Sequence, residues 1–277
     1  MYKRILVVLI LFFFNSLTFA QSYEKEFESN FAWEVKQIDE FIERFNNNDK
    51  TLIKKYASNS TNAKDFTRER MIKSLFDSQG KAWKIEEINQ FIKSAVSKPI
   101  LLDFYNKDWY AKVICSVTWK GMPEVATLIL KLQVFPDSSS KWVVTNVNAN
   151  FLKSTTWKGA AILPAADKYV SLNPVSHATD FMNISKLTEN VKNIKNYVVP
   201  VEEQTNQTKL FLQECVDKNL IIKQVSSISY HFLQIDNWIL EVNQFKRQTK
   251  NSGWLISKLI KATNQEKATY KANYLIK

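Results

Sequence analysis

The sequence predicts an α+β protein with two domains in tandem, each with helices packed on a curved antiparallel sheet. Two observations lead to this prediction. Apolar and polar residues alternate in several segments beyond residue 100, as they do in strands that bury one face. In addition, one pattern occurs twice, at residues 128–147 and 238–259: a strand ending in Phe, a polar loop, a Trp and a second strand. The repeat predicts equivalent hairpins on two separate sheets.

The first twenty residues have the pattern of a cleavable export signal. Lys3 and Arg4 precede an apolar run at residues 5–14, and residues 18–20 (Thr-Phe-Ala) suit a signal peptidase. The apolar run is about half as long as a membrane-spanning helix requires. We therefore expect residues 1–20 to be removed. The mature chain, without a transmembrane segment, is expected in the periplasm or outside a bacterial cell.

Changes in pattern divide the rest of the chain into four parts. In order, we expect a first α+β domain, a connector, a second α+β domain and a polar tail, at residues 21–155, 156–176, 177–262 and 263–277. The connector has little periodicity and contains Gly159, Pro164 and Pro174, which interrupt regular structure.

The first domain is expected to begin with helices and to continue with strands. Apolar residues recur at helical spacing over residues 31–45, and shorter helices are expected at residues 51–57 and after Asp65. Strands are expected at residues 83–91, 99–104, 109–119, 127–135 and 142–147.

This order of elements resembles the opening of NTF2-like domains, the fold of ketosteroid isomerases and of many small binding modules. The resemblance lies in the end of the first helix at residues 41–49 (Phe-Ile-Glu-Arg-Phe-Asn-Asn-Asn-Asp), followed by Leu52, Tyr56 and Ala57. It covers approximately residues 31–150. The resemblance implies a strongly bent sheet whose concave face holds the helices and leaves a conical pocket.

The second domain is expected to contain two helices and three strands. The helices are expected at residues 181–194 and after Thr208, and the strands at residues 228–235, 238–245 and 254–260. This part lacks the Asn-Asp and Tyr-Ala signature, so we expect a diverged or cystatin-like relative of the first domain. The tail is expected to fray or to form a short helix.

Composition argues against several chemistries. The four glycines, at positions 80, 121, 159 and 253, all stand alone, which excludes the glycine-rich phosphate loops of P-loop and Rossmann proteins. The two histidines and two cysteines lack metal-ligand spacing, so we expect no metal and no cofactor. The net charge is +11, with lysines spread along the chain. Together with export, this argues against nucleic acid as a partner.

The two cysteines, Cys115 and Cys215, are expected to be unpaired buried thiols. Cys115 alternates with Val113 and Val117, and Cys215 follows Phe211 by four residues on an apolar helical face. This places each cysteine in the core of a different domain. An exported protein also permits a disulfide, so pairing is the open alternative.

Candidate binding residues of the predicted pocket or its rim are Tyr56, Asp103, Tyr105, Trp109 and Trp142. Asp103 lies between two apolar residues of a predicted strand, so we expect its side chain on the exposed face, where it could not act as a base. Tryptophans in strands are more typical of core or rim packing than of ligand stacking. Lysines beside tryptophans, as at Lys141-Trp142, could bind glycans or anionic polymers, or belong to an ordinary lysine-rich surface.

The function we expect is a non-catalytic exported module that binds a small ligand or a protein. One alternative is a pocket enzyme of the isomerase or dehydratase type. A second is a basic surface for anionic glycan or lipid headgroups, formed by Lys246, Arg247, Lys250, Lys258 and Lys261. No catalytic residue is assigned, because His177 and His231 both lie outside the first domain. His231, in a strand between two aromatic residues, is expected to be structural or exposed.

Overall fold

The computed structural model describes residues 34–47, 67–80, 83–98, 100–155, 157, 159, 171–172, 181, 183–249 and 251–276. The predicted export signal, the predicted helix at residues 51–57 with Tyr56, His177 and most of the predicted connector lie outside these residues.

The chain forms two compact units that are not successive stretches of sequence. The first unit consists of residues 1–101 and 244–257, and the second of residues 102–243 and 258–277. The chain therefore returns to the first unit at the tip of its last hairpin and ends in the second. The predicted domains at residues 21–155 and 177–262 are each divided between the two units.

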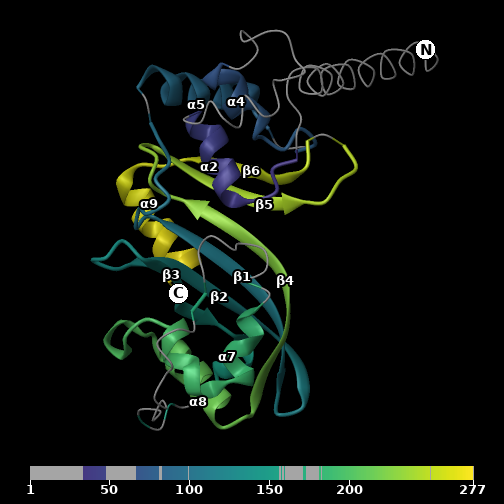
Figure 1. Ribbon diagram of the computed structural model, residues 1–277, viewed down its shortest axis with the longest axis vertical. Helices are drawn as coiled ribbons and strands as arrows, with labels where there is room; N and C mark the ends of the chain where they lie inside the picture. Colours follow the sequence, from purple (N-terminus) through teal and green to yellow (C-terminus); the bar gives the residue numbers. More distant parts are fainter. Residues whose placement is uncertain are drawn as a thin grey trace, which may run out of the picture. The chain divides into compact units, whose positions relative to one another are not determined.

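Six strands form one sheet in the described part of the chain (Figure 1). They are β1 (Trp109–Trp119), β2 (Met122–Val134), β3 (Ser140–Asn148), β4 (Leu220–Phe232), β5 (Trp238–Phe245) and β6 (Gly253–Lys261). Their order is β3-β2-β1-β4-β5-β6, and the pairings from β3 to β5 are antiparallel. The α+β class is thus confirmed, and tandem domains are not. The expectation of two separate sheets is wrong, because β1 pairs with β4 along its whole length and joins the two hairpins.

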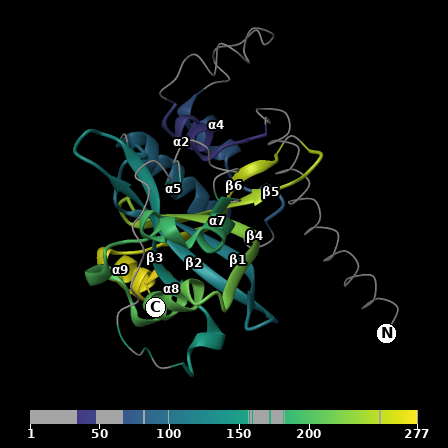
Figure 2. The same cartoon turned by 60° about the horizontal axis from the view of Figure 1, so that its bottom comes forward.

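The central strands bend because their pairing is interrupted. The register between β1 and β4 shifts after Ile114 and again after Ser116. An extra residue on one strand increases the local twist and bends the sheet. The curved course of β1 and β4 is visible in Figure 1 and again in the turned view of Figure 2.

Two strands predicted for the first domain are not formed. The segment predicted as a strand at residues 83–91 belongs largely to helix α5 (Ile85–Ser97), and the described residues 100–104 contain no strand. Helix α5 buries Ile88, Phe91, Ile92 and Ala95, which lie on one face at the helical period. The prediction of a strand overlooked this period.

In the first unit, α5 packs with α2 (Ile38–Asn46) and α4 (Arg68–Ser74) around aromatic side chains. The ring of Phe91 lies 6.1 Å from the rings of both Phe45 and Phe76, measured between centroids. Such edge and tilted contacts add to the free energy of apolar burial.

Arg68 ties the ends of these helices together. Its guanidinium donates to the main-chain carbonyls of Phe45 (3.2 Å), Ala95 (2.9 Å) and Ile100. These carbonyls lie near helix C-termini, where carbonyl oxygens lack partners within the helix. The arginine therefore has a structural role.

Gly253 allows β6 to approach the N-terminal segment of the first unit. The Val35 amide donates to the Ser252 carbonyl (3.0 Å), and the Trp254 amide donates to the Val35 carbonyl (2.8 Å). Gly253 has a φ of 87°, and a β-carbon there would lie 2.1 Å from the Val35 carbonyl oxygen. Both the dihedral angle and the close approach therefore require glycine.

The second unit contains short helical segments and one longer helix. They are η2 (Asn150–Leu152), η3 (Asn183–Ser185), α7 (Lys186–Glu189), η4 (Val191–Tyr197), η5 (Val201–Glu203), α8 (Asn206–Val216), α9 (Asn264–Tyr270) and the π-helical η6 (Lys271–Leu275). The single helix predicted at residues 181–194 is broken at Asn190, whose φ and ψ of −124° and 77° are not helical. No helix in the described ranges has the length and apolar character needed to cross a bilayer.

The two faces of the sheet in the second unit bury different side chains. On one face Trp109 and Trp142 are fully buried, with ring centroids 4.9 Å apart. On the opposite face Tyr110 and Ile129 pack with Leu275 of η6. Trp109 and Trp142, predicted to lie in a pocket or at its rim, are thus core residues.

Cys115 in β1 and Cys215 in α8 are free and buried, as predicted. Burial raises the pKa of the Cys115 thiol to about 12 and also raises the pKa of Cys215. Both cysteines belong to the second unit, however, and not to two domains. They contribute as small apolar groups.

Candidate functional site

A small open cleft in the second unit lies beside β3, the strand at one edge of the sheet. The Val199 amide donates to the Val144 carbonyl of β3 (3.0 Å), so the segment around residue 199 runs against this edge. Where residues 195–204 meet the start of β3, they enclose a cleft of about 280 Å³. We call it the lysine cleft; it is lined by apolar residues 198–201 and by Gln133, Lys141, Lys195 and Gln204.

Lys141 brings a half-buried cation to this cleft. No carboxylate in the described ranges lies within 4.0 Å of its ammonium. The ammonium lies 5.5 Å from the centroid of the Phe135 ring. Burial lowers the pKa of Lys141, because a partly dehydrated ammonium is less stable than one in water. A bound anion would supply the opposite charge that no described residue supplies.

The opposite wall combines a second cation with apolar side chains. Lys195 of η4 is exposed, whereas Val198 and Val199 are buried. The buried Gln204 donates from its Nε2 to the Val199 carbonyl (2.8 Å) and so fixes this turn of the chain. The lining thus offers cations and an apolar surface to the same ligand.

A neighbouring lysine shows the contrasting arrangement. Lys131 precedes Gln133 by two residues on the same face of β2, and its ammonium lies 2.8 Å from the Glu203 carboxylate. Lys131 is therefore neutralised by Glu203, while no carboxylate among the described residues pairs with Lys141.

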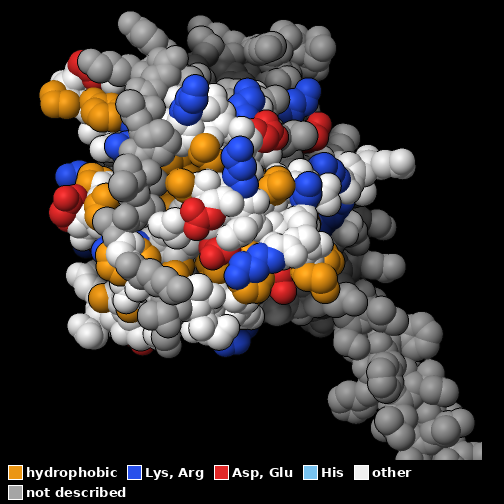
Figure 3. All heavy atoms as spheres, turned by 90° about the horizontal axis from the view of Figure 1, so that it is seen from below, with side chains coloured by type: hydrophobic (Ala, Val, Ile, Leu, Met, Phe, Trp, Pro, Cys, Tyr) orange, Lys and Arg blue, Asp and Glu red, His pale blue; other side chains and the backbone are white. Residues whose placement is uncertain are grey.

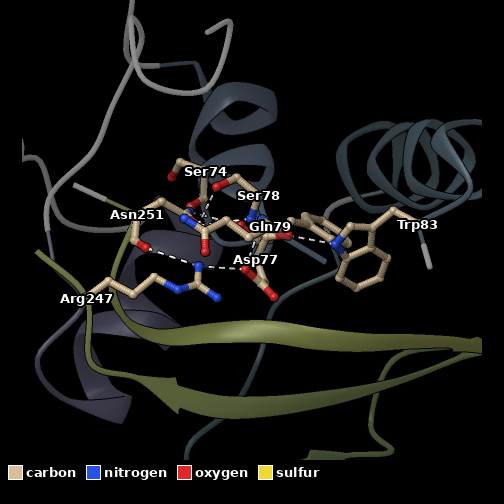
Figure 4. Close-up of polar contacts among 8 residues, drawn as sticks. Ser74, Asp77, Ser78, Gln79, Trp83, Arg247 and Asn251 are labelled. Carbon is tan, nitrogen blue, oxygen red and sulfur yellow. Dashed lines mark hydrogen bonds and ion pairs between the residues drawn. The ribbon is translucent and has the colours of Figure 1, made fainter. Parts of the chain in front are cut away.

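In the first unit a polar cluster is closed on itself, as Figure 4 shows. Asn251, between β5 and β6, is buried. Its Nδ2 donates to the carbonyls of Phe76 (3.0 Å) and Ser74 (3.4 Å), and its Oδ1 accepts from the amide and hydroxyl of Ser78, each at 2.9 Å. With donors and acceptor all used, this carboxamide has a structural role.

The same cluster contains an ion pair. The Arg247 guanidinium lies 2.7 Å from the Asp77 carboxylate, and the two side chains are only 17% and 9% exposed. Trp83 donates from its indole to the Asp77 carbonyl (2.6 Å). Arg247, predicted as part of a basic surface, is therefore engaged internally. Its partner lies 170 positions away, so no local pattern in the sequence indicates the pair.

The other residues of the predicted basic surface remain a prediction. Lys246 belongs to the first unit, Lys258 and Lys261 belong to the second, and all three are exposed. Lys250 lies outside the described residues. On the face seen in Figure 3, lysine and arginine side chains are interspersed with acidic and hydrophobic ones.

Asp103, predicted to lie in a strand, and Tyr105 both lie on an exposed loop. The Asp103 carboxylate accepts from the Tyr105 amide (2.9 Å), and the Asp103 amide donates to the Gln234 side chain (2.8 Å). Asp103 is exposed, as expected, and its carboxylate serves to shape the loop.

His231 is buried on the face of the sheet that α9 covers. Its Nδ1 lies 2.8 Å from the Tyr270 hydroxyl and its Nε2 3.0 Å from the Ser229 hydroxyl. Burial, aided by the positive charges of Lys112 and Lys258, lowers the pKa of His231 to about 3. The imidazole is therefore neutral at pH 7 and links β4 to α9. It is unsuited to act as a base near neutral pH.

Sequence reasoning missed most of the lysine cleft. Lys141 drew notice only as a lysine beside a tryptophan, and Lys195 and Gln204 gave no signal, because they sit among other polar residues in irregular structure. The cleft exists because a distant segment pairs with an edge strand, and no local pattern encodes that contact.

Comparison of the chain with models of protein families, with curated proteins and with solved structures found no match. The resemblance of residues 31–150 to NTF2-like domains therefore stays a prediction.

Proposed function

We propose that this chain is an exported binding module that holds a small anionic molecule with an apolar part in the lysine cleft. One observation carries the proposal: Lys141 is a half-buried cation without an acidic partner among the described residues, in a cleft with an apolar wall. The neighbouring Lys131 has such a partner in Glu203.

The chemistry of the lining favours binding over catalysis. Its polar side chains are two ammonium groups and two carboxamides, which suit the holding of an anion. General acid–base chemistry needs a group whose pKa lies near the working pH. His231, with its pKa lowered to about 3, does not meet that need. The Asp103 carboxylate lies outside the lysine cleft and accepts a hydrogen bond from its own loop.

Two contributions should add in the bound state. A unit charge about 4 Å from Lys141 gains about 4 kcal/mol of Coulomb energy near a protein surface, before the cost of removing water from both groups. Each methylene that the apolar wall takes from water adds up to about 0.8 kcal/mol, or up to about fourfold in affinity.

Isothermal titration with straight-chain carboxylates, from acetate to octanoate, tests the proposal. We expect the affinity to rise with chain length until the cleft is full, and the alcohols of equal length to bind at least tenfold more weakly. Lys141→Met should weaken octanoate binding at least tenfold. Lys192→Met is the matched control, since Lys192 is an exposed lysine on the same segment as Lys195.

Two results would overturn the proposal. One is equal binding of octanoate by Lys141→Met and by the unaltered chain. The other is equal binding of alcohol and carboxylate, which would show that the apolar wall alone selects the ligand.

A further inference from the structure

A second cleft in the second unit has a different chemistry. It has a volume of about 360 Å³ and lies between the loop at residues 106–108, the turn that joins β4 to β5, and helix α9. We call it the α9 cleft; its polar side chains include Asn106, Asp108, Gln234, Asp236, Asn264 and Lys267.

Two of these side chains are fixed and form a rigid part of the lining. The Gln234 carboxamide accepts from the Asp103 amide (2.8 Å) and donates to the Asp103 carbonyl (3.2 Å). The Lys267 ammonium donates to the carbonyls of Leu233 (2.9 Å) and Ile235. Neither side chain has to rearrange to admit a ligand.

Other side chains keep polar atoms available. Asp236 and Asn264 are exposed, and neither side chain makes a hydrogen bond or ion pair to any other residue that the structure describes. The side-chain Oδ1 of Asn106 accepts from the Asp108 amide (2.8 Å), which leaves the NH₂ group of Asn106 to donate elsewhere. The Asp108 carboxylate has its nearest cation, Lys271, at 3.9 Å.

The charges of the lining cancel, which narrows the class of ligand. Two carboxylates, Asp108 and Asp236, face two ammonium groups, Lys267 and Lys271. A divalent cation is disfavoured, because the Lys267 ammonium already occupies the carbonyl oxygens that could ligate it. An anion gains no net Coulomb energy, because the two carboxylates offset the two ammonium groups. What remains is a neutral ligand rich in donors and acceptors.

We propose that the α9 cleft binds a neutral polyhydroxylated ligand, a sugar residue of a glycan. The Asp108 and Asp236 carboxylates would accept from hydroxyl groups, and the carboxamides of Asn106 and Asn264 would donate to hydroxyl or ring oxygens. Tyr105 directly precedes Asn106 along the chain, and its side chain is 53% exposed. The proposal concerns a separate site and does not rest on the lysine cleft.

The test uses the full mature chain and three neutral trisaccharides: maltotriose, cellotriose and chitotriose. Titration followed by protein NMR should show saturable shifts with at least one of them, and none with glycerol. Asp236→Asn should weaken the binding about tenfold or more, since it removes a charge-assisted hydrogen bond. Asp217→Asn, an exposed aspartate at the end of α8, is the matched control and should bind as the unaltered chain does.

Three outcomes would overturn this inference. The first is the absence of a saturable shift with any trisaccharide at about 10 mM, a concentration that would reveal binding of about millimolar affinity. The second is equal affinity of Asp236→Asn and the unaltered chain for the sugar. The third is displacement of the sugar by calcium chloride. Octanoate binding should be the same for Asp236→Asn as for the unaltered chain, so a failure here is distinguishable from a failure at the lysine cleft.

Discussion

The closed cluster of the first unit and the lysine cleft of the second contain similar residue types but differ in whether these residues have partners. In the cluster around Asn251, Asp77 and Arg247, each charge and each carboxamide atom meets a partner within the protein. In the lysine cleft, Lys141 is partly dehydrated and meets no carboxylate in the described ranges. A half-buried polar group is thus informative about binding only when its partners have been counted.

The difference has an energetic meaning. Removing one member of a closed cluster leaves its partners buried without hydrogen bonds, which lowers the free energy of unfolding. Removing Lys141 relieves a dehydrated charge and should cost little, while any ligand that this charge holds is lost. A substitution in the closed cluster should therefore lower stability, whereas Lys141→Met should weaken ligand binding and leave stability nearly unchanged.

The largest expected effect on stability concerns His231, a buried side chain that has hydrogen-bond partners within the protein and is uncharged at pH 7. Its pKa in the folded chain is about 3, below the ordinary value of 6.5, so the unfolded chain binds more protons between these values. Stability should therefore fall on acidification, by about 3 kcal/mol from this residue between pH 6.5 and pH 4. Urea unfolding at several pH values measures this. In His231→Gln the free energy of unfolding should depend less steeply on pH. Equal pH dependence in the variant and the unaltered chain would mean that folding does not lower the pKa of His231.

Asn251→Ala tests whether the closed cluster is structural. The carboxamide makes four hydrogen bonds to Ser74, Phe76 and Ser78, and its loss leaves buried carbonyl and amide groups without partners. We expect the free energy of unfolding to fall by about 2 to 3 kcal/mol. Asn148→Ala, at an exposed strand end, should change it by no more than about 0.5 kcal/mol. Equal effects of the two variants would remove the distinction between closed and open polar groups.

A double-mutant cycle sharpens the comparison for charges. Asp77→Asn and Arg247→Met, made singly and together, should give a coupling of about 1 to 3 kcal/mol, because this pair is largely shielded from water. The same cycle on Lys84 and Glu87, an exposed pair at 3.0 Å, should give no more than about 0.5 kcal/mol. A coupling near zero at Asp77 and Arg247 would show that the cluster is held by its carboxamide alone.

The smallest expected effect on stability belongs to Lys141→Met. Since no described carboxylate depends on this ammonium, thermal unfolding should be unchanged or slightly delayed, within about 0.5 kcal/mol. Between the lowered pKa of Lys141 and its ordinary value of 10.5, the unfolded chain binds more protons, so the unaltered chain should gain stability as the pH rises. The variant should lack that gain. A marked loss of stability at pH 7 would instead assign Lys141 a structural partner.

The sequence by itself was sufficient for the α+β class and for the strands with strong alternation. The observed β1 (Trp109–Trp119) and β5 (Trp238–Phe245) match the predicted bounds, because apolar residues at every second position bury one face of a strand wherever the sheet lies. Local periodicity also placed Cys115 of β1 and Cys215 of α8 in a core. Asp103 is exposed as expected, but on a loop and not on the exposed face of a strand. Local patterns failed where the periods competed, as in α5, and where a polar residue interrupted a helix, as at Asn190.

Only the tertiary structure decided how the pieces combine. The pairing of β1 with β4 joins segments that are more than a hundred positions apart, and it turns two expected sheets into one. The partner of Arg247 and the wall opposite Lys141 are likewise supplied by distant parts of the chain. Pattern and period act over neighbouring residues, whereas dehydration, ion pairing and cleft formation depend on which distant side chains meet. The candidate sites of this protein depend on such contacts between distant side chains.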